Sequence, residues 1–179
     1  MNEPFRYRLR KFAVQQLSRF IPCGDQHERL RELDWDVMII LDACRFDVFN
    51  EVVEWPVERV RSPASKTAEW LSMAEKSGLF KEKTIVTANA NYSSNEYNLE
   101  EKEIIDIFSS NWDEQLGIVP PEPVLDATDE QIKANNSPVV GHILPPHGPY
   151  ISRVANEWFP ALPDTQIWKR GPGNLDEFL

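Results

Sequence analysis

An aspartate that directly follows an apolar run is the first residue of this sequence placed to do chemistry. The run, Val37–Leu41, holds five apolar residues without a charge, and Asp42 comes next. Val and Ile favour extended backbone, so the run predicts a buried strand of a parallel sheet. Ligands of such sheets bind at the carboxyl ends of the strands. Asp42 is therefore a candidate metal ligand, and the alternative is an ordinary cap for a helix that begins near Arg45.

A second candidate, Thr67, opens a periodic segment that extends to Gly78. Glu69 in its first turn and Lys76 in its last turn suit the helix dipole, so the segment predicts a helix. A hydroxyl at the start of that helix lies where backbone N–H groups and the dipole favour a bound anion. Thr67 is thus the preferred nucleophile among the hydroxyls near Ser65, with an ordinary helix N-cap as the alternative.

Two histidines accompany a third apolar run. His142 lies inside a predicted strand over residues 137–144, and His147 lies in the proline-rich loop after it. A divalent metal on Asp42 would lower the pKa of a Thr or Ser hydroxyl and make it a nucleophile toward phosphorus or sulfur, while Lys66 and His147 neutralise charge on the tetrahedral oxyanion. The alternative for His142 is a hydrogen-bonded residue of the core.

Strand-like and helix-like segments alternate around these residues, and the alternation predicts an α/β fold in which helices sandwich a mostly parallel sheet. Strands are expected at residues 37–41, 57–61, 83–87 and 137–144. Helices are expected at residues 46–53, 67–78, 99–108 and 127–134, the last of them capped by Asp126 or Thr128. A polar loop over residues 89–98 separates the third strand from the charged amphipathic helix that follows it.

The composition narrows the class of protein. A chain of 179 residues with 41% hydrophobic content is long enough to bury the core of one domain. Its net charge of -10 argues against a nucleic-acid partner, because such proteins concentrate Lys and Arg, and an acidic, soluble protein is the simpler interpretation. Two cysteines, Cys23 and Cys44, make neither a disulfide framework nor a zinc ribbon, so a reducing, cytoplasmic location is expected.

The N-terminal region, residues 1–34, is interpreted as a basic helix with a linker, separate from a domain over residues 35–179. Basic and apolar residues mix in its first half, without an apolar stretch long enough for a signal peptide or a membrane span. Packing on its own domain is the favoured role of this helix, and association with an anionic membrane face is the alternative.

Several reactive or aromatic residues are expected to be structural. His27, in the charged stretch 25–31, is expected to be solvent exposed, and Cys44 is expected to be a small core residue. The tryptophans are expected to be packing groups: Trp55, Trp70, Trp112, Trp158 and Trp168.

Three segments between Asp36 and Tyr150 resemble the alkaline-phosphatase and sulfatase superfamily, in particular its sulfatase-like hydrolases. Residues 39–47 are similar to the first strand of that family, whose terminal Asp binds metal. Residues 62–70 resemble the nucleophile segment, in which a Thr, Ser or modified Cys opens a helix, and their Thr-x-Glu-aromatic form is similar to threonine-dependent phosphoglycerol transferases. Residues 139–150 are similar to the family's His-x-x-x-Pro-His-x-Pro-Tyr stretch.

The resemblance implies a metal-dependent hydrolase or phosphotransferase that acts on phosphate or sulfate esters. Thr67 would be its nucleophile and, with Asp42, a ligand of a divalent metal, Mn, Zn or Ca. His142, His147 and Lys66 would bind the anionic group of the substrate. The fold implied is an alkaline-phosphatase-like α/β domain, incomplete at its C-terminus.

Two departures from the family pattern define the alternative. The Cys-x-Pro-x-Arg signature that is converted to formylglycine is absent, which disfavours sulfatase activity. The family's later Asp-His pair, which completes the metal site, does not occur before Leu179. The alternative is a truncated or degenerate member that keeps the fold and an anion site but lacks catalysis, and a third possibility is that another chain supplies the missing acids.

Overall fold

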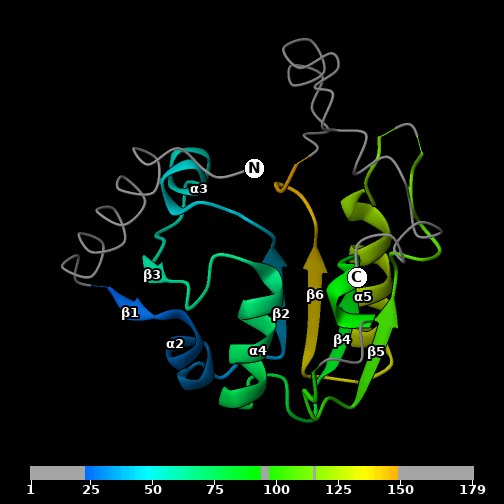
Figure 1. The fold of residues 1–179 in the computed structure, drawn as a ribbon, viewed down its shortest axis with the longest axis horizontal. Helices are drawn as coiled ribbons and strands as arrows, with labels where there is room; N and C mark the ends of the chain where they lie inside the picture. Colours follow the sequence, from blue (N-terminus) through cyan, green and yellow to red (C-terminus); the bar gives the residue numbers. More distant parts are fainter. Residues whose placement is uncertain (1–22, 94–96, 115, 149–179) are drawn as a thin grey trace, which may run out of the picture.

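The main feature of the fold is a four-stranded parallel sheet, seen in a computed structural model that describes residues 23–93, 97–114 and 116–148. Its strands lie side by side in the order β2 (Val37–Leu41), β6 (Val139–Ile143), β4 (Thr84–Thr87) and β5 (Glu103–Asp106) (Figure 1). Every pairing is parallel, so the carboxyl ends of all four strands share one edge. The predicted α/β class with a mostly parallel sheet is confirmed.

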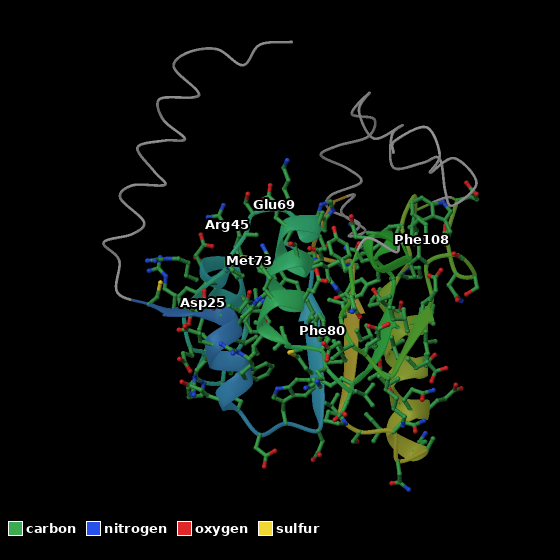
Figure 2. All side chains as sticks on the ribbon, turned by 60° about the horizontal axis from the view of Figure 1, so that its bottom comes forward. Asp25, Arg45, Glu69, Met73, Phe80 and Phe108 are labelled. Atoms are coloured by element: carbon green, nitrogen blue, oxygen red, sulfur yellow. The ribbon has the colours of Figure 1, made fainter. Side chains whose placement is uncertain are left out.

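Helices α4 (Thr67–Ser77) and α5 (Pro121–Lys133) cover opposite faces of this sheet. Successive side chains of β6 point to opposite faces, so Val140 packs in the α4 cluster and Val139 in the α5 cluster. Phe80 lies at the centre of the molecule and is fully buried, stacked at a tilt on Trp70 of α4 (Figure 2). Full burial of an aromatic side chain of this size stabilises the fold by about 1.5–3 kcal/mol.

Helix α4 forms where the sequence predicts it. Glu69 lies in the first turn and Lys76 in the last, which suits the helix dipole. Gly78 ends the helix in the left-handed conformation, φ 64°, and its N–H donates to the carbonyls of Ala74 and Glu75. A residue with a Cβ would be strained at that position, so Gly78 fixes the end of α4.

A smaller layer packs beside α4. Strand β1 (Gly24–Asp25) pairs in parallel with β3 (Val60–Arg61), and α2 (Gln26–Glu32) follows β1 directly. Oδ1 of Asp25 accepts the backbone N–H groups of His27 and Glu28 at 2.9 and 3.1 Å, so Asp25 caps α2. The stretch interpreted as a linker therefore includes β1 and α2. Helix α3 (Phe46–Val52) follows β2 and agrees with its predicted position.

The prediction of a helix at residues 99–108 is wrong, because this segment contains β5. Ile104 and Ile105 of β5 pair with Ile85 and Val86 of β4. The charged residues around the two isoleucines have helical spacing, but β-branched residues fit an open strand edge better, and β4 supplies the hydrogen bonds. An edge strand also tolerates charges at its ends, here Glu103 and Asp106.

Two element boundaries and two burial expectations also differ. Helix α5 begins at Pro121 rather than near residue 127, because proline is well tolerated in the first turn of a helix. The strand predicted at 57–61 is reduced to the two residues of β3. His27 is 3% exposed rather than solvent exposed, because its ring meets Trp70 of α4 edge on at 4.5 Å. Trp55 is 64% exposed, and its ring contact is an edge-on one with Phe49 at 6.4 Å.

Several sequence predictions fall on residues outside those described. These are the N-terminal basic helix, Tyr150, Trp158 and Trp168. Among the helices that the structure describes, none combines the length and the apolar character needed to cross a membrane.

Candidate active site

Asp42 lies at the carboxyl edge of the sheet, as its position after β2 predicts. Its backbone N–H donates to the carbonyl of Ile143 at 3.0 Å, which extends the pairing of β2 with β6 by one residue. Ala43 then takes a left-handed conformation, φ 56°, at a cost of about 1–2 kcal/mol. The side chain of Asp42 is 15% exposed. Because Arg45 is the N-cap of α3 and no side chain caps that helix, the helix-cap role for Asp42 is wrong.

The hydroxyl of Thr67 meets this carboxylate. Oγ1 of Thr67 lies 3.4 Å from both Oδ1 and Oδ2 of Asp42, a long contact in which the hydroxyl donates. Thr67 is the first residue of α4, and Lys66 is the N-cap, so the N-cap role for Thr67 is also wrong. The fold thus brings together a hydroxyl and a carboxylate that lie 25 positions apart in the sequence, and they meet at a helix N-terminus.

Asn89 is a member of the cluster that the sequence analysis did not identify. Its Nδ2 donates to Oδ2 of Asp42 at 2.9 Å. Its Oδ1 accepts the backbone N–H and Nδ2 of Asn91 at 3.0 and 2.8 Å, which fixes the amide. The available signal was its place two residues after β4, because parallel strands end at one edge.

His142 lies beside Asp42, enclosed in the core. Its Nε2 is 3.9 Å from Oδ2 of Asp42, and its ring is 2% exposed. Burial lowers the pKa of His142 to about 4, against the opposing effect of the Asp42 charge, so the ring is neutral near pH 7. The hydrogen-bonded core environment that the sequence offered as an alternative is what surrounds this residue.

Tyr92, in the short helix η1 (Ala90–Ser93), is the second residue that the sequence analysis did not identify. Its hydroxyl oxygen is 2.9 Å from Nδ1 of His142, and the two rings meet edge to face at 5.4 Å. Burial, and secondarily the charge of Asp42, raises the pKa of Tyr92, so the phenol keeps its proton. Nothing in a polar loop of this composition singles out one tyrosine before the fold is known.

Lys66 and His147 lie at the same edge of the sheet but are placed less closely. Lys66 is exposed and directly precedes Thr67. His147 lies in the turn after β6, where its backbone N–H donates to the carbonyl of Leu144 and its Nδ1 is 2.7 Å from the carbonyl of Gly148. The structure therefore brings Thr67 and His142 within 4 Å of the Asp42 carboxylate. Lys66 and His147 lie at the same edge of the sheet without a contact to that carboxylate among those described.

The donors present fit part of a divalent-metal site. The carboxylate of Asp42 and the hydroxyl of Thr67 are oxygen donors, which suit hard cations. Both oxygens of Asp42 accept the long Thr67 contact, and Oδ2 also accepts from Asn89. Over residues 23–93, 97–114 and 116–148, no three His, Cys, Asp or Glu side chains form a group that could hold a metal ion. Asp42 and Thr67 would therefore supply two donors of a site that needs about four to six.

Comparison of the chain with protein-family models, with curated proteins and with solved structures found no match.

Proposed function

We propose that this chain is a metal-dependent hydrolase or phosphotransferase of the alkaline-phosphatase-like type, acting on phosphate or sulfate esters with Thr67 as nucleophile. The observation that carries the proposal is the contact of Thr67 Oγ1 with both carboxylate oxygens of Asp42, at 3.4 Å. A hydroxyl paired with a proton acceptor can become a nucleophile, and a helix N-terminus favours binding of an anionic ester beside it.

The chemical step follows from these groups. Thr67 Oγ1 forms a bond to phosphorus, its proton passes to Asp42, and the ester P–O bond breaks with its electron pair on the leaving oxygen, which takes a proton from water. The hydroxide left by that proton transfer then attacks the phosphothreonine, the P–O bond to Thr67 breaks, and Thr67 Oγ1 recovers the proton held by Asp42; in a phosphotransferase, an alcohol that gives its proton to the hydroxide attacks instead. A sulfate ester would react in the same way at sulfur.

A divalent metal, Mn, Zn or Ca, would be held by Asp42 and Thr67, and when bound it would lower the pKa of the hydroxyl and offset charge on the anionic ester. Lys66, which precedes Thr67, and His147, in the turn after β6, would orient the non-bridging oxygens of the ester through charge and hydrogen bonds. These two roles follow from the resemblance and from the place of both residues at the carboxyl edge.

The alternative is a protein of the same fold that binds an anion without turnover. The 2.9 Å hydrogen bond from Asn89 to Asp42 favours it, because a carboxylate already held by a neutral donor is stable without a catalytic role. Isothermal titration with inorganic phosphate and sulfate, together with the ester assay below, separates the two alternatives. A protein that only binds anions would bind phosphate or sulfate and leave every ester intact.

The test of the proposal is hydrolysis of a chromogenic phosphodiester, phosphomonoester and sulfate ester with Mn²⁺ or Zn²⁺. Thr67→Ala should lower kcat/KM by about 10³-fold or more, and Thr67→Ser should retain part of the activity. Thr84→Val is the matched control, because Thr84 is buried at the amino end of β4, where its hydroxyl lacks a hydrogen-bond partner within the described structure. Equal rates for Thr67→Ala and the parent would exclude Thr67 as nucleophile.

A further inference from the structure

We infer that the Tyr92 hydroxyl donates its hydrogen to Nδ1 of His142, which leaves the ring hydrogen on Nε2, facing the carboxylate of Asp42. His142 is then a positioning residue for Asp42, neither a substrate contact nor a metal ligand. The tautomer stands on geometry alone, whereas its effect on turnover rests on the proposed function.

The Nδ1 end of the ring gives the first argument. The 2.9 Å contact between Tyr92 and Nδ1 permits either direction of donation. Tyr92 is buried, and Nδ1 is the hydrogen-bond partner of its hydroxyl among the contacts of the described residues. Donation from the phenol satisfies its hydrogen, whereas donation from Nδ1 would leave that hydrogen buried without an acceptor.

The Nε2 end gives the second argument. Nε2 is buried, has no hydrogen-bond partner within the described part of the chain, and lies 3.9 Å from Oδ2 of Asp42. A hydrogen on Nε2 presents a positive pole to the carboxylate, whereas a lone pair there would present a negative one. Both ends of the ring therefore favour the same tautomer.

Enclosure of the ring defines what His142 can do. With 2% of its surface exposed, the imidazole cannot reach a substrate at the sheet edge without a rearrangement of the core. It can act on Asp42, whose two oxygens also accept from Thr67 and Asn89. Two neutral donors and the positive pole of the imidazole then face one carboxylate, and they orient it toward the Thr67 hydroxyl without cancelling its charge.

The direct test is the ¹⁵N NMR signature of the imidazoles, which distinguishes a protonated Nε2 from a protonated Nδ1. Wild-type protein should show His142 with its hydrogen on Nε2, with and without added Zn²⁺. Tyr92→Phe, which keeps the ring and removes the hydroxyl, should shift His142 toward a mixture of tautomers. His27 is the internal reference and should not change, and Tyr97→Phe is the matched control. A hydrogen on Nδ1 of His142 in the wild type, or its loss from Nε2 when Zn²⁺ binds, would overturn the inference.

Kinetics supply the second readout. Tyr92→Phe should lower kcat by roughly 10-fold with KM nearly unchanged, because the hydroxyl acts through Asp42 and not on the substrate. A rise in KM at constant kcat would contradict the positioning role. If the parent hydrolyses none of the esters, the proposed function fails, while the NMR result still decides the tautomer.

Discussion

His27 and His142 are buried to the same degree, 3% and 2% exposed, in two different regions of the molecule. His27 belongs to α2 and its ring packs against α4, whereas His142 lies at the carboxyl edge of the sheet. Each ring meets an aromatic ring edge on, Trp70 at 4.5 Å and Tyr92 at 5.4 Å. Burial lowers the pKa of both histidines, and both Nε2 atoms lack a hydrogen-bond partner within the described residues.

The difference lies in the neighbouring acid. The carboxylate of Asp25 is engaged in capping α2, where it accepts the backbone N–H groups of His27 and Glu28. The carboxylate of Asp42 instead accepts from the side chains of Thr67, on α4, and Asn89, in the loop after β4. Burial and a lowered pKa therefore occur at His27 as well as at His142, so neither property by itself marks a site, and the convergence of side chains on one carboxylate is what distinguishes the candidate site.

The largest contrast is expected from the two aspartates. Asp42→Asn should lower ester hydrolysis by about 10³-fold, because it removes both the proton acceptor and the anionic oxygen donor. Asp25→Asn should change the rate by less than about 2-fold, since asparagine caps a helix nearly as well as aspartate. Steady-state kinetics on both variants makes the comparison, and equal losses would mean that Asp42 has no special role.

The two histidines should separate activity from stability. His142→Gln should lower kcat/KM by roughly 10–100-fold, whereas His27→Gln should leave it within about 2-fold. Both variants should lose about 1–3 kcal/mol in the free energy of unfolding, because each disturbs a buried polar group. Urea unfolding beside the kinetic assay gives both quantities, and a similar loss of activity in the two variants would remove the functional distinction between them.

Both histidines should make the free energy of unfolding depend on pH in the same direction. The folded-state pKa of His142 is about 4, below its usual 6.5, so the unfolded chain takes up a proton first as the pH falls. The contribution of neutral His142 to stability is complete above about pH 6.5 and is lost as the pH falls toward 4. Between pH 7 and pH 5 the protonation of this residue should lower the free energy of unfolding by about 2 kcal/mol. His27, whose pKa is also lowered, acts in the same direction.

Urea unfolding at several pH values tests this linkage. The double variant His27→Gln/His142→Gln should have a flatter dependence between pH 7 and pH 5 than the parent. Parallel curves for the two proteins would show that neither histidine stays neutral in the folded state.

The smallest effect is expected at the contact between α2 and α4. Nε1 of Trp70 donates to Oε1 of Gln26 at 2.9 Å, next to His27. Gln26→Ala should lower the free energy of unfolding by about 1 kcal/mol and leave hydrolysis unchanged. Thermal unfolding and the ester assay check both halves, and a clear loss of activity would connect the His27 region to the site.

The comparison of the His27 and His142 regions also shows which features local sequence can predict. The apolar run before Asp42 and the dipole-matched charges of α4 are local signals, and the shared edge of parallel strands then places Asp42 near Thr67. The expectation that His27 is solvent exposed is wrong, because its charged neighbours in the sequence indicate a surface position, whereas its burial comes from the contact with Trp70 of α4. Asn89 and Tyr92 were missed because their partners are 47 and 50 residues distant, and local sequence does not encode which side chain of a polar loop turns inward.

The most direct measurement of the central claim is mass spectrometry of protein quenched in acid during turnover of a phosphodiester. A phosphoryl adduct should appear on the peptide that carries Thr67, in the parent and in Thr84→Val, and should be absent from Thr67→Ala. Turnover by Thr67→Ala at the parent rate, with no adduct on Thr67 in the parent, would contradict the account.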